Sequence, residues 1–394
     1  LASLETAVNL FVTLAVLVTA DRWSTCIAQH QNDTTSPRFY SWKWGVLPGV
    51  LLGLAMLTKI QGFLIIPCII AWGLWIGRTR MVPVLLAWGI TANLVFFLGW
   101  PWLWVAPFEN LQTFLSSASD RVQLHNYYFG QQYADVETPW HYPWVMFLIT
   151  VPIGIHLLGL LGWKSAMSSS QRSRSLLLTG CLLFPLLLFS TRAAVYDGSR
   201  LFLMCFPLWA VVVGAGAERV WNWVTESRSL KTAQLTFACG VAIQMLVIWG
   251  DHPCQLSYYN LLVGQLRGAS VLGLETTYWQ DSLTRTFWQD CEEVIPAGET
   301  ISLGPVLHQF QLEDLTRQIP AIQKKNWKLV PATDKSSAAY RILFLRKADL
   351  SAEDFQLLSE AKPLVELKRE GVLLAVLLQL PSSQTEVQSN EQEA

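Results

Sequence analysis

Residues 44–77 read WGVLPGVLLGLAMLTKIQGFLIIPCIIAWGLWIG, and Lys59 is their only charged side chain. A helix needs about 20 apolar residues to cross the hydrocarbon of a bilayer, so 34 residues are too many for one span. We expect two short spans, at 44–58 and 61–77, with a tight reversal at Lys59. The stretch therefore predicts an integral membrane protein with an ionisable group between two hydrophobic helices.

The composition of the whole chain supports this class. Mean hydropathy is +0.32 and only 14% of the residues are charged, whereas soluble domains carry about 25%. Nineteen tryptophans are typical of a protein with aromatic side chains at the lipid headgroup level. Six more segments predict spans, for about eight in all in an α-helical polytopic membrane protein: 4–20, 83–106, 144–163, 175–190, 201–217 and 233–250.

The distribution of Lys and Arg in the connecting loops predicts the orientation. If the chain changes sides at each span, eleven of these cations fall on one side and four on the other. Cytoplasmic loops carry the excess of positive residues, so the first side is predicted to be cytoplasmic. The C-terminal region then lies outside the cytoplasm, as does the position of Leu1. Because Leu1 opens directly at a hydrophobic segment without an initiator Met, we expect an N-terminally truncated fragment.

After the last span the composition changes. We expect a transmembrane domain at 1–250, a membrane-proximal extracytoplasmic segment at 251–294, a small extracytoplasmic α/β domain at 295–380 and a disordered tail at 381–394. Within the α/β domain, the predicted strands are 300–303, 340–345 and 371–378, and 351–358 is predicted to be a capped helix.

The predicted topology places most of the polar side chains that could take part in catalysis or binding on the outer face. Glu5 begins the first span, and it is a candidate general base, or the partner that orients one. The alternative is a carboxylate that merely caps a helix end. Lys59 is a candidate for binding a lipid-linked phosphate, because ionisable groups near a membrane are costly to keep. Its alternative is a loop lysine that reaches outward to water.

The segment before the seventh span supplies further candidates. Arg192 and Arg200 could form a fork for a phosphate or pyrophosphate, with Asp197 holding one of them. The alternative is an ordinary Asp-Gly turn with a structural salt bridge. Aromatic and histidine side chains on the same face are candidates to contact a sugar or an acceptor, or else they only anchor the protein at the interface: His125, Tyr127, Tyr128, His141, Tyr142 and Tyr196.

Other functional classes find no support in the sequence. It contains no phosphate-binding Walker loop, no nucleophile elbow, no zinc-protease motif and no dinucleotide fingerprint. Cys and His residues show no metal-ligand spacing, so we expect neither a metal nor a cofactor. The net charge is −1 without a basic run, so no nucleic-acid partner is expected.

Several segments together resemble one family. Residues 49–59, GVLLGLAMLTK, resemble a Gly-rich segment ending in Thr-Lys-Gly of the bacterial protein O-mannosyltransferases and aminoarabinose-transferase-like enzymes, glycosyltransferase family 39. Residues 139–144, PWHYPW, and 196–203, YDGSRLFL, resemble two further elements of that family. Glu5 matches the family's second acidic position, which is usually Asp. Ile60 replaces the family's Gly after the lysine.

The resemblance implies a GT-C fold in the bacterial inner membrane and an active site at the outer leaflet. It implies a polyprenyl-phosphate sugar as donor and an extracytoplasmic protein, lipid or glycan as acceptor. The family's first acidic motif precedes Leu1, so the fragment alone is expected to be inactive. The leading hypothesis is thus a glycosyltransferase in which an acid of the preceding loop acts as base, assisted by Glu5. The alternatives are a transporter or flippase of lipid-linked sugars and a non-catalytic envelope scaffold.

Overall fold

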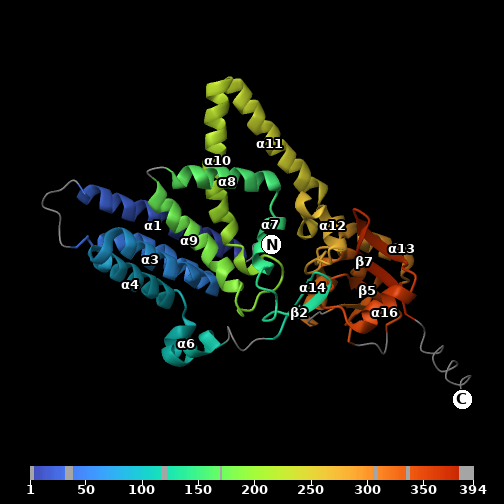
Figure 1. The fold of residues 1–394 in the computed structure, drawn as a ribbon. Helices are drawn as coiled ribbons and strands as arrows, with labels where there is room; N and C mark the ends of the chain where they lie inside the picture. Colours follow the sequence, from blue (N-terminus) through green and yellow to red (C-terminus); the bar gives the residue numbers. More distant parts are fainter. Residues whose placement is uncertain are drawn as a thin grey trace, which may run out of the picture. The chain divides into compact units, whose positions relative to one another are not determined.

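The protein was studied as a computed structural model, which describes residues 4–31, 39–116, 122–168, 171–305, 309–333 and 338–380. The predicted disordered tail at 381–394 lies outside them. The described residues are mostly helical, with several apolar helices and a small region of sheet (Figure 1). The chain divides into two compact units, Leu1–Leu124 with Asp135–Phe237, and His125–Ala134 with Ala238–Ala394.

The first unit consists of helices. Apolar residues occupy most of their length, as the sequence predicts. In chain order they are α1 (Leu4–Gln31), α2 (Lys43–Thr58), η1 (Ile60–Ile65), α3 (Ile66–Gly77), η2 (Arg78–Met81), α4 (Val82–Leu98), α5 (Trp102–Val105), α6 (Pro107–Ser116), α7 (Tyr142–Ile149), α8 (Ile153–Met167), α9 (Arg172–Phe189), η3 (Arg200–Phe202), α10 (Cys205–Ser227) and the start of α11 (Leu230–Gly250).

Four stretches among the described residues are long and apolar enough to cross a membrane as helices. They are Glu5–His30, Ile60–Leu98, Arg172–Phe189 and Leu230–Val247. A fifth is obtained if α7 and α8, which meet at a bend of 107°, form one broken span. Membrane-spanning helices are therefore present by length and composition, and the number eight stays a prediction.

The bend between α7 and α8 corrects the single continuous span expected at 144–163. The helix is broken between Ile149 and Ile153. Pro152 cannot donate a backbone hydrogen bond, which makes it a natural helix breaker. The polar groups at the break serve the backbone, because the Thr150 hydroxyl donates to the Met146 carbonyl (2.6 Å) and His156 Nε2 lies 3.1 Å from the Leu148 carbonyl.

Glycines bring α2 and α4 into close contact. Gly45, Gly49 and Gly53 recur every four residues on α2. A Cβ atom added at these positions would lie 2.2, 2.5 and 2.7 Å from the carbonyl oxygens of Val84, Trp88 and Ala92. Small residues at this spacing let two membrane helices approach backbone to backbone. We call the contact at Gly45, Gly49 and Gly53 the glycine seam. It fixes where α2, and the Lys59 that follows it, lies against α4.

The second unit contains a five-stranded sheet in the order β4-β3-β5-β7-β6. The β3 strand pairs in parallel with β4 and β5, whereas β7 pairs antiparallel with β5 and β6. The strands are β3 (Thr300–Gly304), β4 (Lys328–Pro331), β5 (Tyr340–Phe344), β6 (Val365–Arg369) and β7 (Val372–Gln379); the helices are α12 (Gln265–Val271), α13 (Arg285–Val294), α14 (Gln309–Gln318), α15 (Pro320–Lys325) and α16 (Ala352–Glu360), with short η4 (Gln255–Ser257) and η5 (Leu261–Val263).

Both faces of this sheet are buried. On β5, Ile342 and Phe344 pack into one hydrophobic cluster, and the intervening Leu343 packs into another. This alternation is the period of two expected for a strand covered on both faces. The predicted capped helix is confirmed as α16, where Ser351 and Asp354 form a reciprocal capping box.

A hairpin from the middle of the sequence completes the second unit. It consists of β1 (His125–Tyr128) and β2 (Gln131–Ala134). The Gly130 N–H donates to the Gly273 carbonyl at 2.9 Å, and the Gln132 amide donates to the Lys347 carbonyl at 2.6 Å. The sequence places this segment between the predicted spans 83–106 and 144–163 and gives no sign of that attachment.

Beside the hairpin, one carboxylate is fully enclosed. Glu275 is only 3% exposed, and it accepts the backbone N–H groups of Lys347 (2.9 Å) and Ala348 (2.8 Å). Burial raises the pKa of this carboxyl to about 7, although the two N–H donors act in the opposite direction. Glu275 therefore joins the segment before α13 to the loop after β5.

Candidate functional site

Three segments far apart in the sequence meet at one carboxylate. Glu5, in the first turn of α1, accepts hydrogen bonds at the same oxygen, Oε1, from Lys59 Nζ at 2.9 Å and from Arg200 Nε at 2.7 Å. Arg200 also donates through an Nη atom to Asp197 at 2.9 Å. We call Glu5, Lys59, Asp197 and Arg200 the charge cluster.

Lys59 owes its position to a break between two helices. The residue is extended, with φ −167° and ψ 152°, after α2 ends and before η1 begins. The chain then folds back tightly, so that a Cβ at Gly62 would lie 2.4 Å from the Ala55 carbonyl oxygen. Only glycine permits this approach. The predicted reversal at 58–62 is thus present.

A tight turn presents Arg200. Asp197 and Gly198 both have positive φ angles, 57° and 63°, and the Arg200 N–H donates to the Asp197 carbonyl at 3.2 Å. Asp tolerates this left-handed region better than most residues, and Gly does so without strain. Burial alone would lower the pKa of the Arg200 guanidinium, but its hydrogen bonds to Glu5 and Asp197 outweigh that effect and raise it.

The four side chains are not equally accessible. The carboxylates are the more enclosed, with 12% of the Glu5 side chain and 4% of Asp197 exposed. The cations are more open, at 19% for Lys59 and 33% for Arg200. The two carboxylates are thus the enclosed members of the charge cluster, and the accessible side of the cluster is positively charged.

Sequence reasoning missed one supporting residue. Asp135 is 3% exposed, its carboxylate accepts the Leu124 N–H at 3.1 Å, and its carbonyl accepts the Val195 N–H at 3.1 Å. The second contact holds the chain just before Tyr196 and Asp197. Asp135 follows an aromatic stretch without any recognisable motif, so nothing in the sequence marks it.

The other predicted site residues lie in varied surroundings. Arg192 is exposed and forms no ion pair among the residues that the structure describes. Tyr142 is 2% exposed at the start of α7, whereas His141 and Tyr196 are half-buried. His125, Tyr127 and Tyr128 belong to the second unit, where Tyr128 is buried and Lys347 Nζ lies 5.2 Å from the Tyr127 ring centre.

Comparisons with known proteins add a loose structural likeness. No family model and no curated protein sequence matches this chain. The crystal structure of ArnT from Cupriavidus metallidurans bound to undecaprenyl phosphate is 12% identical and covers 95% of this chain and 75% of its own, with a TM-score of 0.40. The apo structure of the same protein is 13% identical and covers 95% and 83%, with a TM-score of 0.41. A likeness at this level identifies neither a family nor a substrate.

Proposed function

We propose that the protein is a membrane glycosyltransferase that moves a sugar from a polyprenyl-phosphate donor to an acceptor outside the cytoplasm. The observation that carries the proposal is the charge cluster, in which Lys59 and Arg200 converge on Glu5 from separate segments. The two cations form a pair suited to a lipid phosphate, and Lys59 immediately precedes Ile60–Leu98, a stretch suited to crossing a membrane.

The chemistry of phosphate recognition supports this assignment. Lys binds a phosphate as a compact point charge, and Arg offers a planar fork of N–H donors. Both cations are the accessible members of the charge cluster, so a headgroup phosphate can approach them without displacing Glu5 or Asp197. Charged residues beside a membrane are costly, and they persist where a site needs them.

In the proposed reaction, an acceptor hydroxyl or amine attacks the anomeric carbon of the donor sugar. The bond from that carbon to the phosphate oxygen breaks, and the polyprenyl phosphate leaves with the bonding electrons. Lys59 and Arg200 stabilise the charge that develops on this leaving group, which is a large part of catalysis in such sites. The proton of the acceptor passes to a general base.

Glu5 is assigned a positioning role in this scheme. Its Oε1 already accepts from Lys59 and Arg200, so this oxygen serves to hold the two cations at a fixed separation. The general base is then a second acid, as the family resemblance implies. Asp197 holds Arg200 from the other side in the same way.

The remaining features of the proposal concern placement. We propose about eight spans in a bacterial inner membrane, with the charge cluster and the C-terminal α/β domain on the outer side, as the distribution of Lys and Arg predicts. The half-exposed aromatic and histidine side chains are proposed to contact sugar or acceptor. Tyr128 and Tyr142 are 1% and 2% exposed, so we assign them to packing instead.

A transporter of lipid-linked sugars is the alternative with an observation in its favour. Broken helices near the membrane midplane are typical of transporters, and α7 and α8 form such a pair. At this break, however, Thr150 and His156 bond to backbone carbonyls of the same segment. These two side chains satisfy backbone carbonyls at the break, so they favour a structural bend over a substrate site.

The test is transfer from radiolabelled polyprenyl-phosphate sugars in membranes that carry the full-length protein. Lys59→Ala and Arg200→Ala should each lower transfer at limiting donor. Arg172→Ala, at the first residue of α9, is the matched control because it removes an exposed arginine outside the charge cluster. Donor kinetics unchanged in both site variants would refute the phosphate assignment. Absence of transfer from every donor in the wild type would favour the transporter or the envelope scaffold.

A further inference from the structure

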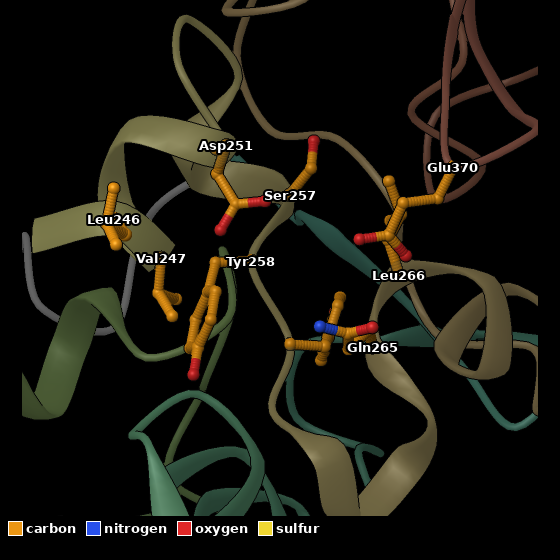
Figure 2. Close-up of a pocket in the computed structure, with 10 residues that line it drawn as sticks. Leu246, Val247, Asp251, Ser257, Tyr258, Gln265, Leu266 and Glu370 are labelled. Carbon is orange, nitrogen blue, oxygen red and sulfur yellow. The ribbon is translucent and has the colours of Figure 1, made fainter. Parts of the chain in front are cut away.

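A second candidate site lies within the second unit, at the end of α11. A cavity of about 210 Å³ lies there, and Figure 2 shows the side chains that line it. Its walls combine apolar side chains with Asp251, Ser257, Tyr258, Gln265 and Glu370. The cavity accommodates a small polar group.

Two carboxylates and no cationic side chain are among the described residues that line the cavity. Asp251 and Glu370 both line it, from the end of α11 and from the turn between β6 and β7. Arg369 is turned to backbone oxygens, and donates to the carbonyls of Gly250 and His252. Burial raises the pKa of the Asp251 carboxyl, Glu370 raises it further, and Arg369 only partly opposes them.

One buried hydroxyl in the cavity wall has no protein partner among the described residues. Ser257 is 3% exposed, lines the cavity, and its hydroxyl has no hydrogen-bond partner among the described residues. A buried polar atom left in this way costs free energy unless a ligand or water satisfies it. Gln265 and Glu370 also adopt left-handed backbone conformations, with φ of 58° and 49°, which non-glycine residues rarely do.

The cavity opens where a predicted span ends. The span Leu230–Val247 finishes within its wall, and Leu246 lines it while remaining 69% exposed. Trp249, one residue before the end of α11, is 79% exposed, as expected for an indole at the headgroup level. A ligand held here therefore sits at the depth of lipid headgroups, with apolar helix surface beside it for a lipid chain.

We propose that this cavity binds the primary ammonium group of a membrane lipid headgroup. An ammonium has three N–H donors and no acceptor, which matches a wall of two carboxylates, a phenol and an amide. The C-terminal end of α11 adds the negative end of a helix dipole to the same place. The site is independent of the charge cluster, so neither proposal depends on the other.

The test compares lipids that differ only in their amine. The full-length protein is reconstituted in nanodiscs that contain equal amounts of phosphatidylethanolamine and phosphatidylcholine. The protein is then released from the nanodiscs in the mass spectrometer, and the lipids that stay bound to it are counted by native mass spectrometry. We expect about tenfold enrichment of phosphatidylethanolamine, from charge-assisted hydrogen bonds that choline cannot form. Asp251→Asn and Glu370→Gln should each bring the ratio close to one.

Glu366→Gln is the matched control, since Glu366 is exposed on β6, just before the turn that carries Glu370, does not line the cavity and pairs with Lys368. It should keep the enrichment. Equal retention of both lipids by the wild type would overturn the proposal, as would enrichment that persists in both Asp251→Asn and Glu370→Gln. Displacement of phosphatidylethanolamine by millimolar free ethanolamine would support the ammonium site and show that a soluble amine can also occupy it.

Discussion

The contact between Glu5 and Lys59 predicts that the two residues act as a unit in transfer. The atoms are 2.9 Å apart, and the side chains are 12% and 19% exposed. A hydrogen bond with charged partners contributes about 1.5–3 kcal/mol, and partial exposure places this one near the lower end. Because about 1.4 kcal/mol is tenfold in rate, Glu5→Gln and Lys59→Met should each lower kcat/KM for the donor about tenfold or more.

The double variant makes the prediction specific. If Glu5 acts partly by holding Lys59, the loss in the double variant should be clearly smaller than the product of the two single losses, because the Lys59 contact is removed only once. Any loss beyond that of Lys59→Met then measures the contact of Glu5 with Arg200. Transfer is measured in membranes at limiting donor, normalised to folded protein by size-exclusion chromatography. A control cycle of Glu5→Gln with Arg172→Ala should be additive. An additive loss of about a hundredfold for Glu5 with Lys59 would refute the positioning role.

Three more predictions follow from the structure. Gly49→Ala should lower the free energy of unfolding by about 3 kcal/mol, and with it the melting temperature, because its Cβ would lie 2.5 Å from the α4 backbone. Gly89→Ala is the control and should leave the melting temperature unchanged, because its Cβ would meet nothing within 4 Å. The free energy of unfolding of the second unit should fall by about 3 kcal/mol as pH rises from 4.5 to about 7. The pKa of the Glu275 carboxyl is raised in the folded state, so the folded state keeps this proton up to a higher pH than the unfolded state does. Hydrogen exchange of the sheet amides, corrected for intrinsic rates, should show this slope in the wild type and not in Glu275→Gln. Cysteines introduced at Tyr133 and at Ser168 should react with impermeant reagents from opposite sides of the membrane, and labelling from one side would overturn the predicted topology.

Helices were the most predictable part of this fold. Apolar composition alone marks a membrane helix, because every backbone group there must bond within the helix. Each predicted span corresponds to a helix or a pair of helices. The break after Ile149 was missed because the apolar pattern continues through it, although Pro152 was a local signal. The four-residue spacing of Gly45, Gly49 and Gly53 is likewise visible in the sequence, and it indicates a helix-packing face rather than a function.

In the second unit, prediction followed the strength of the local pattern. The three predicted strands, 300–303, 340–345 and 371–378, were confirmed as β3, β5 and β7. The other two strands, β4 and β6, were missed. β6 reads Val-Glu-Leu-Lys-Arg and lies at the sheet edge, where charged residues are expected and obscure the apolar alternation. The hairpin at 125–134 depends on contacts with Gly273 and Lys347, which no local pattern reveals.

The candidate site was predictable as a set of residues and not as a geometry. Alternation of membrane sides placed Glu5, Lys59, Asp197 and Arg200 on one face. It could not show that Lys59 and Arg200 share a single oxygen of Glu5, since these contacts cross 54 and 195 residues of sequence. The structure separates Arg192 from this group by giving it an exposed position without an ion pair among the described residues.

The glycine seam and the charge cluster are mechanically linked, because α2 carries both. Lys59 follows the last residue of α2, and the seam sets how close α2 lies to α4. A side chain at Gly49 must push the helices apart, since the opposing atoms belong to the α4 backbone and cannot rotate away. An outward shift of about 1 Å would stretch the 2.9 Å contact between Lys59 and Glu5 beyond hydrogen-bond range. Any Gly49 variant that still folds should therefore lose donor kcat/KM in the same way as Lys59→Met, although its side chain is remote from the proposed phosphate site.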